Sequence, residues 1–314
     1  MCDRARLNRC ALVLLIGLAA SAASAQESQP RRPGGGGLAL PEGTKEVLDV
    51  AYVKGGGASQ SLDLFVPPNA NKPMPLVIWI HGGGWQKGDK GQCPAKVMTR
   101  FGYVVASINY RLSQEAIFPA QINDCKAAVR WLRAHADEYH IDPDRVGVWG
   151  ASAGGHLVAL LGTAGDAKDL EGDGGNAKFS SKVQAVCDFF GPADLTKVRD
   201  ETAADNAVTK LLGGSIRDHL DKAKQASPVT YVTKDDPPFL IMHGTKDPLV
   251  QPRQSEWLND ALKQAGVESH LEIIEGAGHG GPEFATLEHR RMILEFFDAH
   301  LKPAAKGSTT QPAK

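Results

Sequence analysis

One turn restricts the fold of this chain more than any other stretch. The turn Gly150-Ala-Ser-Ala-Gly154 follows a short apolar run at 146–149 and precedes apolar residues at helical spacing within 157–161. The sequence therefore predicts a strand, a sharp turn and a helix, with Ser152 at the tip of the turn. Glycine at each shoulder leaves room where a side chain would clash, so that the serine hydroxyl is exposed. A lone G-x-S-x-G is common by chance, so the rest of the chain must decide its meaning.

Two stretches could supply backbone donors near this serine. The predicted helix would aim its first amide, that of Ala153, and the positive end of its dipole at a developing oxyanion. The segment His81-Gly-Gly-Gly84 follows a continuous apolar run and carries no Cβ atoms at its glycines. Gly83 and Gly84 are therefore expected to bring their amides close to a substrate, and Trp85 is expected to contact it. A flexible turn would also explain three glycines, but not their place between this run and a tryptophan.

A serine hydroxyl needs a base, because it is a poor nucleophile at neutral pH. His279 lies in the glycine-rich segment 276–281, directly after the last predicted strand, where a base can reach the serine turn. Other histidines, including His156, fall within or near predicted helices and are interpreted as structural. Asp247 follows a strand that ends at His243 and is the expected carboxylate partner of the base. A turn-forming Asp-Pro is the alternative interpretation of Asp247.

Apolar runs and amphipathic segments alternate along the chain. Strands are predicted at 46–53, 61–66, 75–80, 103–109, 146–149, 183–190, 238–243 and 269–274, and helices near 94–101, 120–139, 153–162, 251–265 and 287–301. The first two strands read as an antiparallel hairpin, and the remainder predicts an α/β fold with a mostly parallel central sheet and helices on both faces. Ligands of such sheets bind at the carboxyl ends of the strands, where every candidate above falls.

The folded domain is predicted to span residues 46–302. Within it, residues 193–228 are polar and helical in character without a partner strand, and they are interpreted as a small cap insertion. Residues 26–45 are rich in glycine and proline and read as a disordered linker. Residues 303–314 are expected to be a disordered tail.

The N-terminus has the pattern of a targeting segment. Three arginines accompany an apolar run at 10–20, and Ala23-Ser-Ala25 has the small residues of a cleavage site. Residues 1–25 are therefore expected to be a signal peptide that leaves Gln26 as the new N-terminus of an exported, periplasmic or extracellular protein. The apolar run is too short to span a bilayer, so no membrane anchor is expected after cleavage.

Charge and motifs exclude several kinds of partner. The net charge of −1 favours neither nucleic acid nor a membrane surface. No zinc-protease motif, C-x-x-C or P-loop is present, and no metal or cofactor is expected. One acidic, glycine-rich loop could hold calcium, but its spacing does not fit an EF-hand and a solvated loop is the better interpretation. The acidic residues of this loop are Asp166, Asp169, Glu171 and Asp173.

Three cysteines remain after the expected cleavage: Cys93, Cys125 and Cys187. An odd number in an exported protein allows one disulfide and one free thiol. A bond between Cys93 and Cys125 is favoured, because both fall near the starts of predicted helices. Three buried free thiols are the alternative.

Five motifs together resemble one family. They are His81-Gly-Gly-Gly-Trp85, Asn109-Tyr-Arg111, Gly150-Ala-Ser-Ala-Gly-Gly-His156, His243-Gly-Thr-Lys-Asp-Pro248 and Gly278-His-Gly280. Over roughly residues 45–301 the chain resembles secreted α/β-hydrolase esterases, close to the hormone-sensitive-lipase and bacterial feruloyl-esterase-like (BD-FAE) branch. The resemblance implies a serine carboxylic-ester hydrolase without metal or organic cofactor, and it implies the oxyanion donors given above. The long N-terminal cap of the lipase-like branch is not expected here, which argues against long-chain lipids.

The expected function is therefore an exported serine esterase that forms an acyl-enzyme on Ser152 with His279 as base and Asp247 as its partner. Acetyl or feruloyl groups on small molecules or polysaccharides are the expected substrates. A peptidase of the prolyl-oligopeptidase type has the same order of serine, aspartate and histidine, but it usually carries a large N-terminal domain. A hydrolase-fold binding protein usually lacks a triad member or the glycines. The sequence does not indicate the oligomeric state.

Overall fold

The computed structural model describes residues 40–68, 70–198 and 206–302. The predicted signal peptide at 1–25 and the predicted tail at 303–314 lie outside the described residues, as does most of the predicted linker.

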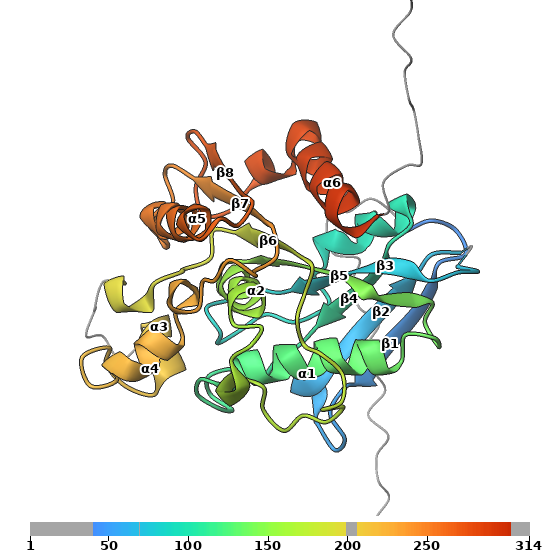
Figure 1. The fold of residues 1–314 in the computed structure, drawn as a ribbon, viewed down its shortest axis with the longest axis horizontal. Coiled ribbons are helices and arrows are strands. Elements are labelled where there is room, and N and C mark those ends of the chain that lie inside the picture. Colours follow the sequence, from blue (N-terminus) through green and yellow to red (C-terminus); the bar gives the residue numbers. More distant parts are fainter. Residues whose placement is uncertain (1–39, 69, 199–205, 303–314) are drawn as a thin grey trace, which may run out of the picture. The chain divides into compact units, whose positions relative to one another are not determined.

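The described strands form one eight-stranded sheet in the order β1-β2-β4-β3-β5-β6-β7-β8 (Figure 1). The strands are β1 (Lys45–Ala51), β2 (Ser61–Val66), β3 (Met74–Ile80), β4 (Val104–Ile108), β5 (Ile141–Ala151), β6 (Ala185–Phe189), β7 (Phe239–Gly244) and β8 (Ser269–Ile274). Strand β2 pairs antiparallel with β1 and β4, and all other pairs are parallel. The predicted α/β-hydrolase fold, with an antiparallel hairpin leading into a mostly parallel sheet, is confirmed.

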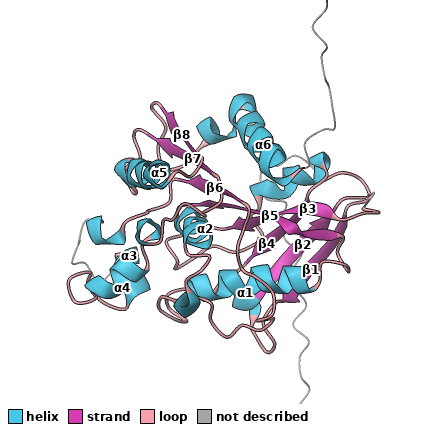
Figure 2. Cartoon of the chain, in the orientation of Figure 1, coloured by secondary structure: helices cyan, strands magenta, loops and turns pink. Residues whose placement is uncertain are grey.

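Helices cover both faces of this sheet (Figure 2). They are α1 (Ala120–Ala134), α2 (Ala153–Thr163), α3 (Ala207–Leu212), α4 (Leu220–Gln225), α5 (Arg253–Ala265) and α6 (Leu287–Leu301). Figure 1 shows α1 and α6 on opposite sides of the sheet. Side chains of a strand alternate between faces, so Ile78 packs in the core under α1 and α2 while Val77 packs in the core under α6.

The helix predicted over 120–139 is shorter than expected, because α1 ends at Ala134. The backbone amide of His135 donates to the Trp131 carbonyl at 3.1 Å, and the ring Nδ1 of His135 lies 2.8 Å from the same oxygen. The histidine thus satisfies a terminal carbonyl of the helix, and the chain turns toward β5. The segment predicted as a helix at 94–101 is a 3₁₀ helix over Pro94–Phe101.

The insertion between β6 and β7 carries α3 and α4 in its described part. A Cβ on Gly84 would lie 3.3 Å from the Cβ of Ala207, at the start of α3. The amide of Phe118 donates to the Leu211 carbonyl at 2.8 Å. Helix α3 therefore lies against the glycine loop that follows β3. That residues 193–228 form a small cap stays a prediction.

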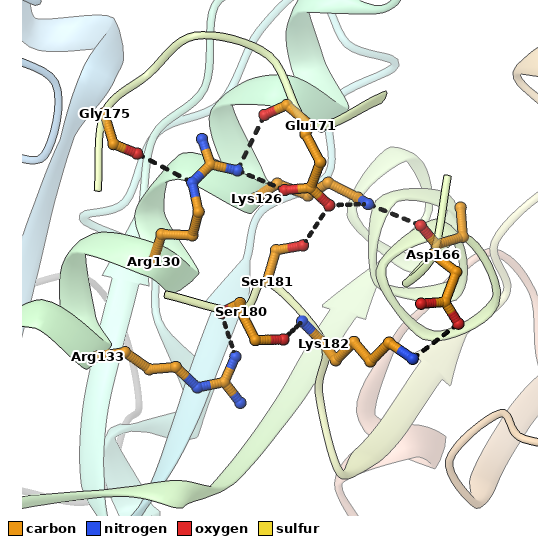
Figure 3. Close-up of polar contacts among 10 residues, drawn as sticks. Lys126, Arg130, Arg133, Asp166, Glu171, Gly175, Ser180, Ser181 and Lys182 are labelled. Carbon is orange, nitrogen blue, oxygen red and sulfur yellow. Dashed lines mark hydrogen bonds and ion pairs between the residues drawn. The ribbon is translucent and has the colours of Figure 1, made fainter. Parts of the chain in front are cut away.

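The acidic loop between α2 and β6 is held by cations of α1 (Figure 3). The buried ammonium of Lys126 donates to Glu171 at 2.7 Å and to the Ala164 carbonyl at 2.6 Å. Arg130 donates to the other carboxylate oxygen of Glu171 at 2.7 Å, and Asp166 pairs with Lys182 at 2.7 Å. No group of three or more metal-ligating side chains occurs within the described residues, so the structure gives the calcium interpretation no support.

The expected disulfide between Cys93 and Cys125 is wrong, because all three described cysteines are free thiols. Cys93 packs against the core under α6, whereas Cys125 belongs to α1 and is buried in the core on the other face. The sheet therefore separates the two sulfur atoms. Spacing near helix starts could not reveal this, because the face on which each helix packs depends on the strand order.

None of the helices within the described residues combines the length and apolarity that crossing a membrane requires.

Candidate active site

Ser152 lies at a strained turn between β5 and α2, as the sequence predicts. Its backbone has φ 58° and ψ −119°, a conformation that residues with a side chain rarely adopt. Its amide donates to the Phe189 carbonyl at 2.8 Å. A Cβ on Gly150 would lie 2.3 Å from the carbonyl oxygen of Gly154, and a Cβ on Gly154 would lie 2.1 Å from that of Ile80. Only glycine fits at these two positions, so the crowded backbone fixes the serine where it stands.

The structure brings the three predicted triad residues together. The Nε2 atom of His279 lies 2.8 Å from Ser152 Oγ, and its Nδ1 atom lies 2.6 Å from Asp247 Oδ2. A carboxylate only accepts hydrogen bonds, so Nδ1 carries the proton and Nε2 is left to accept from the serine hydroxyl. The imidazole keeps 15 % of its surface exposed, while the Asp247 side chain is fully buried. This tautomer can take a proton from Ser152.

Asp247 is held as a carboxylate by several donors. Oδ1 accepts from the amides of Leu249 at 2.8 Å and Val250 at 2.9 Å, and Oδ2 lies 3.2 Å from Nε2 of His243. Burial raises the pKa of Asp247, but the hydrogen bonds from His243, His279 and the two amides outweigh it and bring the pKa well below its usual range. The negative charge is therefore in place to stabilise a protonated His279.

His243 is a supporting residue whose role the sequence did not assign. It is fully buried at the end of β7, with Nδ1 2.7 Å from Ser255 Oγ and Nε2 2.9 Å from the Val250 carbonyl. It thereby ties the loop that carries Asp247 to the first turns of α5. The spacing of four residues between His243 and Asp247 was a signal that could have indicated this contact.

Phe190 is a second supporting residue that the sequence did not reveal. It follows β6 with φ 44°, and its ring centroid lies 4.6 Å from that of His279 and 4.9 Å from that of Phe284. Phe190 therefore packs against the imidazole and is itself packed against Phe284. Its left-handed backbone turns the ring toward His279, and sequence pattern does not predict such a conformation for phenylalanine.

The glycine loop lies beside the nucleophile. A Cβ on Gly82 would be 3.3 Å from the Cβ of Ser152, and Gly83 and Gly84 have φ of 108° and 60°. The amides of Gly83, Gly84 and Ala153 donate to no acceptor in the part of the chain that the structure describes. Backbone amides away from bulk water are normally paired. These three are thus available to an oxygen atom of a bound molecule.

Trp85 corrects one prediction. Its side chain is only 3 % exposed, and its indole nitrogen donates to Nδ1 of the buried His156 at 3.2 Å. The two rings meet edge to face with centroids 5.1 Å apart. Trp85 is too buried to contact a substrate. Its side chain instead packs in the core and supports the glycine loop that precedes it.

The chain is similar to known ester hydrolases in sequence and in fold. The BD-FAE family model matches residues 62–262. Probable carboxylic ester hydrolase LipM of Mycobacterium tuberculosis is 33 % identical over 74 % of this chain and 58 % of its own length. Carboxylesterase NlhH of the same organism is 35 % identical over 79 % of this chain and 78 % of its own length. The chain thus spans less than two thirds of LipM, and the same holds for esterase LipQ at 60 %.

Solved structures of esterases share the fold. A truncated form of a carbohydrate esterase from gut microbiota is 33 % identical, with a TM-score of 0.78 over 83 % of this chain and 98 % of the other. Esterase 2 of the planctomycete Thermogutta terrifontis is 26 % identical, with a TM-score of 0.69 over 85 % of this chain and 97 % of the other.

Proposed function

This chain belongs to the BD-FAE family, and on that premise we propose that it is a serine carboxylesterase acting on short-chain or carbohydrate-linked acyl esters. The observation that carries the proposal is the hydrogen-bonded chain from Asp247 through His279 to Ser152, with distances of 2.6 and 2.8 Å. It lies beside three backbone amides that donate to no acceptor within the described residues. Nucleophile, base, orienting carboxylate and oxyanion donors are the parts that acyl transfer requires.

The proposed reaction has two steps. His279 takes the hydroxyl proton as Ser152 Oγ attacks the ester carbonyl, and the resulting oxyanion is stabilised by the amides of Gly83, Gly84 and Ala153. The protonated imidazole then gives its proton to the departing alcohol, which leaves an acyl group on Ser152. In the second step His279 activates a water molecule, which releases the carboxylic acid and restores the serine.

Two observations support a small acyl group and a sugar-linked alcohol. Ala207 of α3 is so close to Gly84 that a Cβ there would lie 3.3 Å away, which favours acetyl over a long acyl chain at the glycine loop. The structural neighbour with a TM-score of 0.78 is described as a carbohydrate esterase. Export after cleavage between Ala25 and Gln26 is part of the same proposal, and it rests on the sequence pattern of residues 1–25.

A substrate panel tests the activity. Purified protein should hydrolyse p-nitrophenyl acetate faster than p-nitrophenyl octanoate, release acetate from acetylated xylo-oligosaccharides or ferulate from methyl ferulate, and leave a proline p-nitroanilide intact. Ser152→Ala should lose both turnover and labelling by a fluorophosphonate. Turnover of the anilide alone would indicate a peptidase, and no turnover or labelling of the wild type would indicate a binding protein. Mass spectrometry of the exported fraction tests the N-terminus at Gln26.

A further inference from the structure

A buried histidine outside the triad makes two hydrogen bonds that the proposed reaction does not use. His156 lies in the first turn of α2 and is fully buried. Its Nδ1 atom lies 3.2 Å from the indole nitrogen of Trp85, and its Nε2 atom lies 2.6 Å from the Ala226 carbonyl. An indole nitrogen only donates and a carbonyl only accepts, so Nδ1 is unprotonated and Nε2 carries the proton. Burial lowers the pKa of His156 to about 4, which keeps the ring neutral in this arrangement.

These bonds join three parts of the site. Trp85 directly follows the glycine loop, and His156 lies on the helix that begins with the Ala153 amide. Ala226 caps the C-terminus of α4, in the insertion between β6 and β7. One imidazole therefore connects the two groups of oxyanion donors with each other and with the insertion.

The glycine loop depends on such an anchor. Gly82, Gly83 and Gly84 have no side chains to pack, so Trp85 is the first side chain after them that enters the core. The backbone of Trp85 has φ 56°, a left-handed conformation that a bulky residue adopts only when its surroundings enforce it. Its carbonyl accepts from the amide of Ser113 at 2.7 Å, and its indole is held by His156. The bond from Ser113 thus fixes the backbone of Trp85, and the bond to His156 fixes its indole ring.

We propose that His156 is a positioning residue, which holds the amides of Gly83 and Gly84 in register with Ser152 by anchoring Trp85 to helix α2. The bond to Ala226 extends this support to the insertion between β6 and β7, so that the insertion and the oxyanion donors are aligned by one side chain. The inference rests on the proposed esterase function and adds a residue that contacts neither substrate nor the reacting atoms.

Substitutions separate positioning from packing. In His156→Leu, turnover of p-nitrophenyl acetate per active site, titrated with a fluorophosphonate, should fall roughly tenfold to a hundredfold with KM changed less than about twofold. Trp85→Phe removes the indole donor and should cause a similar loss. The double variant should lose little more than His156→Leu alone, because His156→Leu already removes the bond that Trp85→Phe removes. His156→Gln keeps an acceptor and a donor and should recover most of the activity.

A tetrahedral boronic acid inhibitor provides the readout that packing alone would not change. Its affinity should fall in parallel with kcat in His156→Leu, since it occupies the oxyanion position. His135→Leu is the matched control, because His135 packs on Trp131 at the end of α1 and should leave kcat per active site unchanged.

A folded His156→Leu that keeps both kcat and boronate affinity within about twofold of wild type would overturn the proposal. If His156→Leu does not fold, Trp85→Phe decides by the same criterion, and His156→Gln should stay close to wild type. If the wild type hydrolyses no ester, the proposed function fails instead, and the rate of Ser152 labelling by fluorophosphonate then compares the variants without turnover. Equal labelling rates would reject the positioning role.

Discussion

Ser152 has a backbone conformation, φ 58° and ψ −119°, that glycine adopts more easily than any residue with a Cβ atom. Ser152→Gly and Ser152→Ala should both be inactive, but they should differ in stability. We expect the glycine variant to be more stable than the alanine variant by about 1 kcal/mol. Glycine relieves the backbone strain of the folded turn, and this gain outweighs the larger conformational entropy that glycine gives to the unfolded chain. Urea denaturation measures the difference. Equal midpoints would mean that the turn stores no strain.

Asp188 is a buried carboxylate close below this turn. Its Oδ1 accepts from the Gly191 amide at 2.9 Å, and its Oδ2 has no partner within the described residues. Burial raises its pKa from 3.8 to about 6. The folded state therefore binds this proton more tightly than the unfolded state. The contribution of Asp188 favours folding below about pH 4 and is lost as the pH rises through about 6.

Asp188→Asn should remove this pH dependence. A difference of two pKa units corresponds to about 3 kcal/mol. Between pH 4 and pH 7 the wild type should therefore lose about that much stability relative to the variant. Urea titrations of both proteins across this range measure the difference, in which the other titrating groups cancel. Parallel curves for the two proteins would show that the pKa of Asp188 is the same in the folded and unfolded states.

At the scale of elements, helix α2 is packed so closely on the sheet that a side chain at one of its glycines would crowd the core. A Cβ on Gly162 would lie 2.6 Å from the Phe239 ring and 2.8 Å from Val186. Alanine favours a helix over glycine by about 1 kcal/mol, yet crowding of a packed core costs about 1 to 3 kcal/mol. Gly162→Ala should therefore lower the melting temperature while kcat per active site is unchanged.

The matched control for this substitution is Gly57→Ala. No atom lies within 4 Å of a Cβ built on Gly57. Its φ of −81° is also accessible to alanine. The control variant should melt at or slightly above the temperature of wild type. If both alanine variants melt alike, the contact between α2 and the sheet is looser than the structure indicates.

The sequence predicted the elements better than their contacts. Strands buried on both faces appear as continuous apolar runs, and the candidates Ser152, Asp247 and His279 follow such runs at one end of the sheet, where the structure brings them together. Burial of Trp85 and the contact of Phe190 with His279 could not be predicted. They depend on which non-consecutive strands are neighbours and on local backbone angles, neither of which leaves a pattern in the sequence.

At the scale of the whole molecule, the acidic loop between α2 and β6 is attached to α1 by a buried cation. The Lys126 ammonium has no exposed surface and pairs with Glu171, whose side chain is 33 % exposed. Glu171→Gln removes the counter-charge of a buried ammonium and should lower the free energy of unfolding by about 2 kcal/mol after allowance for the exposed carboxylate. Lys126→Met combined with Glu171→Gln should cost less than the sum of the single changes.

The exposed pair Lys182–Asp166 in the same loop is the control for this prediction (Figure 3). Asp166→Asn should change the free energy of unfolding by less than about 0.5 kcal/mol, because solvent screens this pair. Chemical denaturation of all variants measures these values. Additive effects of the Lys126 and Glu171 substitutions would show that the two side chains are not coupled.

The order of the strands has a consequence for the time at which this protein becomes reactive. The glycine loop follows β3 and Ser152 follows β5, so both are synthesised before Asp247 and His279, which follow β7 and β8. Strands β3, β4 and β5 are neighbours within the sheet, whereas β7 and β8 lie toward one of its edges. A nascent chain therefore carries its nucleophile without a base until the last two strands have joined β6. On the proposed function, ester hydrolysis begins only after these strands have docked, so the return of activity during refolding would time the docking of this final edge.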